Sequence, residues 1–390
     1  MPPDTIIRVD GIIIGRDQMR SSASKILFLM FSILLFAAFA VAQSGRVQPK
    51  TTPTPPDDDP VKVDTEEVKL NLLAFDERGQ FFQGVTKDDV VITENNILHA
   101  PESLKRIPAN VLIVMDTGGE MRSMKTLDDT RRVARALVGN LRAEDSVAIL
   151  QYADKAVITS EWSTDKEQIS KSIGRTKFGI HSAFVDALNL ARSFLMNGEL
   201  ENKHLVLITD GTDSSADLSK KNAAMKSFLS TDIAVHVLSY AKMEAVAIAP
   251  RTKAISNAPA PVVMPDEVKA TLPNGSRDIM QAPKIGPTIN VDRTFLKKMK
   301  ARKADLELAE EMLQTLAENT NGTDISPGST DEMEAKTATV AKNIDASYVL
   351  TYIPKVPFAE RGGERNIEVT SKRAGLVVQA NRKFVVPAKR

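Results

Sequence analysis

The chain has 390 residues and no cysteine, which excludes disulfides, thiol catalysis and cysteine-ligated zinc. Its 51 basic and 50 acidic residues leave a net charge of +1, so no overall charge favours nucleic acid or an acidic membrane. This length and a hydrophobic content of 42% are those of a folded protein with room for two domains.

The N-terminal segment is apolar and has the features of an export signal. Residues 26–42 contain no charged side chain, and Lys25 precedes them. Because Ala40 and Ala42 satisfy the rule of small residues before a cleavage site, we expect a signal peptide over residues 1–42. The mature protein would then be secreted or periplasmic, with no stable membrane span.

Two alternatives concern this segment. It could stay uncleaved as a membrane anchor, although its 17 residues fall short of the roughly 20 apolar residues that a spanning helix needs. Translation could also begin at Met19, because residues 19–25 have the composition of a conventional positive region. After the signal, residues 43–61 are rich in proline, threonine and aspartate, which predicts an extended linker.

Both ends of the remaining chain are predicted to form strands. In residues 62–106, Val68, Leu70 and Leu72 alternate with polar positions, and residues 345–390 contain three further β-rich runs separated by turns. Neither segment alone buries enough apolar surface to be stable. We therefore expect the two ends to pair into one smaller β-sandwich domain.

The middle of the chain, residues 108–344, alternates strand and helix patterns. Continuous apolar runs predict strands buried on both faces, and they lie at residues 111–115, 146–150, 205–209 and 233–239. Helical patterns follow them, at about residues 132–140, 182–195, 303–319 and 331–343. This alternation predicts an α/β domain with a doubly wound, mostly parallel sheet.

An insertion interrupts this domain at about residues 243–302. It contains seven of the 20 prolines of the chain and shows weak periodicity, so we expect a long, mobile loop. Five basic residues lie between Lys297 and Lys303, near its end. Such a run usually marks a solvated helix face, and the alternative is a contact with an acidic partner.

Acidic residues follow two of the apolar strands. Asp116 and Asp210 come directly after the runs at 111–115 and 205–209, and Ser182 opens a helix between them. Ligands in such sheets bind beyond the carboxyl ends of the strands, where these side chains should meet. Two carboxylates and a hydroxyl suit Mg²⁺, Ca²⁺ or Mn²⁺. The alternative is that each aspartate only caps the next helix, but three such elements in this order favour a metal site.

This order resembles a von Willebrand factor type A (VWA) domain, whose fold is Rossmann-like. That family binds a metal through Asp-x-Ser-x-Ser after the first strand, a threonine on an inner helix and Thr-Asp-Gly after a central strand. Asp116 and Asp210 match the aspartates, Ser182 replaces the threonine, and Gly118 and Glu120 replace the two serines. The resemblance implies a degenerate site that binds Mg²⁺ or Ca²⁺ weakly; its residues are Asp116, Glu120, Ser182 and Asp210. Glu120 would be either a third carboxylate ligand or a source of excess negative charge.

The likeness continues outside the metal site. The runs at residues 68–79, 83–94, 313–322 and 346–354 resemble, in that succession, the VWFA-related domain family of secreted acidobacterial proteins. The match covers residues 62–390 apart from the insertion. This resemblance predicts the architecture of the chain in more detail than its function.

The resemblance implies an exported protein that binds a protein partner, or adheres, through the site edge of the α/β domain. The alternative is a metal-independent envelope scaffold with a vestigial site, which binds through the β-sandwich or the insertion. A metal-assisted hydrolase is disfavoured, because no base or nucleophile is placed beside the carboxylates and the four histidines are scattered. We therefore expect no enzyme activity, no catalytic residue and no nucleic-acid partner.

Overall fold

The structure is a computed structural model, and residues 64–390 form one compact unit. The described residues are 66–119, 122–215, 217–259, 286–358, 360, 362–380 and 383–386. The expected signal peptide and linker, together residues 1–61, and the site residue Glu120 lie outside them. No helix within the described ranges is both long enough and apolar enough to cross a membrane.

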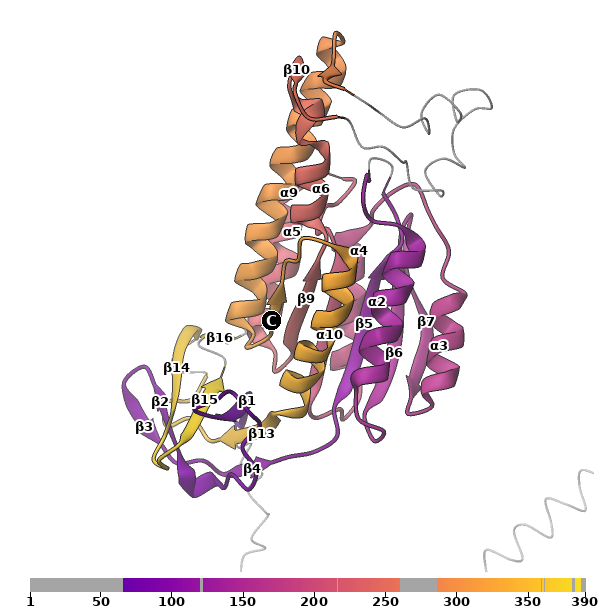
Figure 1. Ribbon diagram of the computed structural model, residues 1–390. Helices are drawn as coiled ribbons and strands as arrows, with labels where there is room; N and C mark the ends of the chain where they lie inside the picture. Colours follow the sequence, from indigo (N-terminus) through magenta and orange to yellow (C-terminus); the bar gives the residue numbers. More distant parts are fainter. Residues whose placement is uncertain are drawn as a thin grey trace, which may run out of the picture. The chain divides into compact units, whose positions relative to one another are not determined.

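A six-stranded sheet forms the centre of the α/β domain (Figure 1). Its strands, in spatial order, are β12 (Asp324–Ile325), β9 (Ala234–Ser239), β8 (Lys203–Thr209), β5 (Asn110–Asp116), β6 (Ser146–Tyr152) and β7 (Ala156–Ser163). All neighbouring pairs are parallel except β6 and β7, which are antiparallel. The predicted doubly wound, mostly parallel fold is therefore confirmed.

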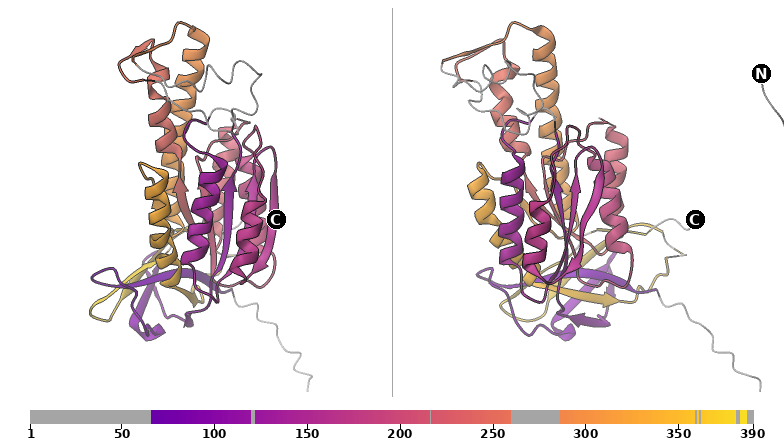
Figure 2. Two further views of the ribbon diagram at one scale, coloured as in Figure 1. Left: turned by 45° about the vertical axis from the view of Figure 1, so that its right-hand side comes forward. Right: turned by 90° about the vertical axis from the view of Figure 1, so that its right-hand side faces the viewer.

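Helices cover both faces of the sheet (Figures 1 and 2). One face packs against α2 (Leu127–Asn140), α3 (Lys166–Gly174) and α10 (Thr330–Asp345). The other packs against α4 (Phe184–Met196), α5 (Leu218–Lys226), η2 (Ser227–Ser230) and α9 (Arg293–Asn319). Side chains alternate along a strand, so Ile113 of β5 enters the first core and Leu112 the second. This two-sided burial explains why the strands read as continuous apolar runs.

Helical structure extends further into the expected loop than the sequence pattern indicated. Helix α6 (Ala241–Ile248) follows β9 almost directly, and α9 begins at Arg293 rather than near residue 303. The two helices pack through Ala245, Ile248 and Leu306, and this tertiary burial stabilises them in spite of the weak periodicity. They run side by side beyond the carboxyl ends of the strands (Figure 2). They are joined through η3 (Ala249–Thr252), β10 (Ile255–Ser256) and β11 (Thr288–Ile289); residues 260–285 are outside the described ranges.

Strands from both ends of the described chain together form two four-stranded sheets. The first has the order β15 (Leu376–Ala380), β1 (Val68–Asp76), β13 (Ser347–Tyr352) and β4 (Ser103–Lys105). The second has the order β16 (Lys383–Val386), β14 (Gly363–Ser371), β2 (Val90–Glu94) and β3 (Ile97–His99), with η1 (Lys87–Asp89) leading into β2. Leu72 of β1 lies opposite Tyr348 of β13, and both sheets contribute to one apolar core. The β-sandwich predicted from the two chain ends is confirmed.

Candidate functional site

Two buried carboxylates meet at the carboxyl edge of the six-stranded sheet. Asp116 is the last residue of β5, and Asp210 follows the last residue of β8. These strands are parallel neighbours, with Met115 opposite Ile208, so the two aspartates leave the sheet side by side. Both side chains are almost completely buried. Two neighbouring buried carboxylates require positive charge or hydrogen-bond donors, because the charges repel and are poorly solvated.

A lysine supplies the positive charge. The ammonium nitrogen Nζ of Lys125 lies 2.5 Å from Oδ2 of Asp116 and 3.2 Å from Oδ2 of Asp210. The Lys125 side chain is only 1% exposed, so this ion pair is shielded from water. Lys125 stands in the loop between β5 and α2, just before the helix cap Thr126.

A second cation, Arg302 of α9, pairs with Asp210 and, at 3.7 Å, with Asp305 on the same helix. Its Nη2 atom lies 3.1 Å from Oδ2 of Asp210, and its Nη1 atom donates to Oγ1 of Thr212 at 2.6 Å. Thr212 in turn donates from its backbone nitrogen and its hydroxyl to Oδ1 of Asp210. We expected the basic run from Lys297 to Lys303 to be a solvated helix face, and Arg302 departs from that expectation because its side chain is 10% exposed and points into the site.

Asp116 accepts hydrogen bonds from the loop after β5 and from the last residue of β8. The backbone nitrogen of Gly118 donates to Oδ1 of Asp116 at 3.1 Å, and the hydroxyl of Thr209 donates to Oδ2 at 3.3 Å. The Tyr152 hydroxyl lies 2.6 Å from the same threonine hydroxyl. Both carboxylates therefore have hydrogen-bond donors at both oxygens.

The two carboxyl groups differ in pKa. Burial raises the pKa of Asp116, and the negative charge of Asp210 adds to this effect, while Lys125 opposes it. Burial would also raise the pKa of Asp210, but the charges of Lys125 and Arg302 outweigh it and hold the pKa below its ordinary value. Asp210 has two cationic partners and Asp116 has one, which accounts for the difference.

The loop that carries Lys125 is fastened by a buried carboxylate. Glu244 of α6 accepts hydrogen bonds from the backbone nitrogens of Ser123, Met124 and Lys125, at 2.6, 2.8 and 2.7 Å. Burial raises the pKa of Glu244, although these three donors lower it. Three consecutive amides bound to one carboxylate leave the loop little freedom, so the position of Lys125 is set by the backbone as well as by its charge.

The structure brings together only some of the residues expected to share a metal. Asp116 and Asp210 meet through Lys125, as described above. The hydroxyl of Ser182 donates instead to the carbonyl oxygen of Thr212 at 2.8 Å, so it joins two loops. Glu120 lies outside the described residues.

Sequence reasoning did not identify Lys125, Glu244 or Arg302 as members of the site. Only Arg302 carried a signal, because it belongs to the basic run that we noted. Lys125 and Glu244 are single charged residues without a motif, and only their positions in the fold distinguish them.

The arrangement does not fit the metal that the resemblance implies. The two carboxylates are already paired with Lys125 and Arg302. A Cβ atom at Gly118, where the family has a serine ligand, would lie 2.0 Å from the carbonyl oxygen of His181 and 2.9 Å from Cα of Ala153. Among the described residues, no group of three or more acidic or histidine side chains could hold an ion.

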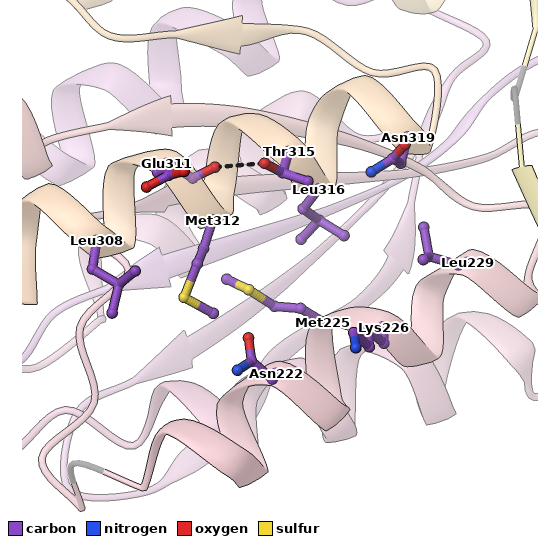
Figure 3. A pocket seen from close by; sticks show the side chains of 10 residues that line it. All are labelled: Asn222, Met225, Lys226, Leu229, Leu308, Glu311, Met312, Thr315, Leu316 and Asn319. Carbon is purple, nitrogen blue, oxygen red and sulfur yellow. Dashed lines mark hydrogen bonds between the residues drawn. The ribbon is translucent and has the colours of Figure 1, made fainter.

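A separate concave feature lies between α5 and α9 (Figure 3). Its apolar lining consists of Met225, Leu229, Leu308, Met312 and Leu316. Asparagine, lysine, glutamate and threonine side chains complete the lining. This pocket shares no residue with the buried carboxylate site.

Comparison with curated proteins gave no match. Among solved structures, BatB from Bacteroides thetaiotaomicron is 17% identical, with 60% of this chain and 98% of that chain covered and a TM-score of 0.36. An aerotolerance-related membrane protein from Bacteroides fragilis is 20% identical, with 61% and 98% covered and a TM-score of 0.37. The VWA domain of the type V pili tip protein Mfa5 from Porphyromonas gingivalis is 18% identical, with 28% and 40% covered and a TM-score of 0.25.

Sequence identities and TM-scores this low do not assign the chain to a family. The domain is assigned from a family model. Residues 111–212 match the model of the von Willebrand factor type A domain. The match begins in β5, contains Asp116, Lys125 and Asp210, and ends directly after the carboxylate site. The chain therefore contains a von Willebrand factor type A domain.

Proposed function

We propose that this protein is an exported interaction module that binds a protein partner at the carboxyl edge of its α/β domain. The family match supports a binding role, since VWA domains are in general interaction modules rather than enzymes. The signal-like residues 1–42 support export. The sequence runs at residues 68–79, 83–94, 313–322 and 346–354 support membership in the VWFA-related family.

The observation that carries the proposal is a set of exposed apolar side chains on the loops of this edge. Met124 follows β5, Ile180 precedes α4, and Leu218 begins α5 after the Asp210 loop; each is between 43% and 47% exposed. Apolar side chains surrounded by polar loops are typical of a protein-binding surface. Nucleic acid is not proposed as a partner, because the net charge is +1 and the exposed side chains are apolar.

The chain segments that carry these side chains are fastened by hydrogen bonds to neighbouring segments. The backbone nitrogen of His181 donates to Asp154 at 2.8 Å, and the backbone nitrogen of Ser182 donates to the hydroxyl of Ser214 at 2.7 Å. Glu244 fastens the third loop, as described above. A surface whose backbone is already ordered loses less conformational entropy when a partner binds.

No ion and no catalytic residue belong to this proposal. Asp116 and Asp210 are neutralised by protein cations, so neither carboxylate is left to bind a metal or to act as a general base.

The second candidate is the metal-independent scaffold that binds through the insertion. It is favoured by exposed apolar side chains near the junction of α6 and α9, where Ile255 and Ile289 lie opposite each other in β10 and β11. They are 68% and 65% exposed.

The two candidates can be separated in one experiment. Residues 43–390 are immobilised and exposed to an extract of the native envelope, and the retained proteins are quantified by mass spectrometry. Replacing Met124, Ile180 or Leu218 with serine should reduce capture of the main partner roughly tenfold or more, as for side chains at the centre of an interface. Met196→Ser, at a similarly exposed position at the far end of α4, should leave capture unchanged. Loss of capture with Ile255→Ser and Ile289→Ser, but not with the edge variants, would favour the scaffold.

A further inference from the structure

Lys125 and Arg302 match the charges of the two buried aspartates without any added ion, and the third carboxylate near Arg302, Asp305 at 3.7 Å, is 45% exposed. Asp116 and Asp210 contribute two negative charges, and Lys125 and Arg302 contribute two positive charges. All four side chains are buried or nearly so. A divalent cation in this setting would add two charges with no free carboxylate to neutralise them.

Lys125 is the member of this group that touches both aspartates. Its ammonium lies 2.5 and 3.2 Å from one oxygen of each, so it occupies the position between the carboxylates where a shared cation would be bound. Of these two aspartates, Arg302 contacts Asp210. Without Lys125, the two buried carboxylates would therefore keep one cationic partner, Arg302, which contacts Asp210.

The lysine is built into the site by the surrounding backbone. Glu244 binds the amide of Lys125 and of the two residues before it, and the hydroxyl of Thr126 accepts from the backbone nitrogen of Asp129 to begin α2. The loop is thus held on both sides of Lys125. Such support from neighbouring hydrogen bonds is what a precisely placed charge requires.

Gly118 supports the same conclusion from the opposite side of Asp116. The carbonyl oxygen of His181 approaches so closely that no side chain fits there. The backbone segment around His181 therefore occupies the space from which a serine ligand would reach a metal.

From these contacts we infer that Lys125 is a permanent internal cation, which takes the place of the metal ion at the edge of this VWA domain. The carboxyl edge is then complete without a metal, and its loops hold their arrangement independently of divalent cations. This role of Lys125 belongs to the folded chain alone and is independent of the protein partner proposed above.

A double-mutant cycle tests whether Lys125 compensates the two carboxylates. Lys125→Met keeps an unbranched side chain that is one atom shorter and removes the charge, and it should lower the Tm by roughly 10 °C. Asp116→Asn should lower the Tm of the parent, because it removes a partner of Lys125, but should raise the Tm of the Lys125→Met variant, because it relieves the repulsion from Asp210. Lys220→Met, at a lysine that is 73% exposed, should leave the Tm unchanged.

The sign of the Asp116→Asn effect decides the outcome. The same sign in both backgrounds, or a Lys125→Met variant that melts like the parent, would overturn the inference. If Lys125→Met does not fold, the double variant Asp116→Asn/Lys125→Met must still fold, because its remaining pair of Asp210 and Arg302 is neutral; failure of the double variant would also count against the inference.

Titration with metal gives an independent measurement. Mg²⁺, Ca²⁺ and Mn²⁺ should produce no heat in calorimetry and no shift in the Tm of the parent, and EDTA should have no effect. Stabilisation of the parent by any of the three ions would show that the lysine does not replace the metal.

Discussion

At the scale of single residues, two buried histidines form a hydrogen-bonded chain that requires both to be neutral. Nδ1 of His236 accepts from the backbone nitrogen of Thr323, so the proton of His236 resides on Nε2. That nitrogen lies 3.0 Å from Nδ1 of His204, whose own Nε2 lies 2.9 Å from Oδ1 of Asn202. One tautomer of each ring satisfies every contact, and an additional proton would place two N–H groups against each other.

The histidine pair predicts a loss of stability in mild acid. Burial lowers the pKa of His236 to about 3; burial, His236 and Arg142 lower the pKa of His204 well below its ordinary value. In the unfolded chain both rings take up a proton near pH 6.5, so the unfolded state binds more protons below that pH. As the pH drops from 6.5 to 5, the free energy of unfolding should therefore fall with a slope that approaches about 1.4 kcal/mol per pH unit for each histidine at the acidic end.

Urea unfolding at several pH values measures this slope. His236→Gln removes one titrating ring and should reduce the slope by about half. His181→Gln, at an exposed position, should leave it unchanged. An equal slope in the parent and in His236→Gln would contradict the assignment of the pH dependence to this pair.

At the scale of secondary-structure elements, a buried ion pair joins the neighbouring strands β2 and β14, and a tyrosine hydroxyl links it to the other sheet of the β-sandwich. Nη1 of Arg365 on β14 lies 2.5 Å from Oε1 of Glu94 on β2, and the hydroxyl of Tyr352 on β13 donates to Oε2 of Glu94 at 2.8 Å. Arg365 also donates to the carbonyl oxygens of Val356 and Pro357. The pair therefore orders the connection between β13 and β14 as well as joining the first segment of the domain to the second.

Loss of Arg365 should be strongly destabilising. Arg365→Met leaves the buried carboxylate of Glu94 without its cation, which costs about 3–5 kcal/mol of unfolding free energy. Arg373→Met, at an exposed arginine that pairs with Asp89 at 3.5 Å, should cost at most about 1 kcal/mol. Denaturant unfolding of the two variants compares them directly, and Glu94→Gln introduced into Arg365→Met should recover part of the loss. Equal losses for the two arginines would refute a special contribution from the buried pair.

At the scale of the whole described unit, polar side chains join the β-sandwich to the α/β domain. Asn321, in the left-handed conformation at φ 58°, donates from its side chain to the carbonyl oxygens of Asn71 and Gln379 at 3.0 and 3.1 Å. The hydroxyl of Ser347 donates to Oδ1 of Asn202 at 3.1 Å. Asn71 is a polar residue within an apolar strand, and its side-chain amide donates to Oδ1 of Asn202 at 3.5 Å, which gives it a role in the same junction. The buried amide groups at this junction need their hydrogen-bond partners, so they define one arrangement of the β-sandwich and the α/β domain.

The two-segment organisation of the β-sandwich predicts the result of a truncation. Deleting residues 345–390 removes β13 and β15, which flank β1 on both sides, and β14, which pairs with β2. The apolar faces of residues 62–106 should then be exposed, and the truncated protein should aggregate. Deleting only residues 383–390 removes the edge strand β16 and should leave a soluble protein. Size-exclusion chromatography and limited proteolysis measure both; a soluble long truncation whose residues 62–106 still resist protease would contradict the pairing.

The sequence alone determined the features that depend on local patterns. Continuous apolar runs identified β5, β6, β8 and β9, and the acidic residues at two run ends identified the edge where Asp116 and Asp210 meet. These predictions succeed because strand periodicity, two-sided burial and the direction of parallel strands are properties of short segments. The beginning of α9 was missed because packing on α6, rather than its own periodicity, stabilises that part of the helix.

Only the tertiary structure decided what neutralises the two aspartates. Lys125 is 85 residues from Asp210 in sequence, Arg302 is 92 residues from it, and Glu244 fastens a loop about 120 residues earlier. A charged residue has the same local signal whether it faces water or enters a site. The balance of charge in a buried site depends on distances of a few ångströms between distant segments, and those distances exist only after the sheet and its helices have packed.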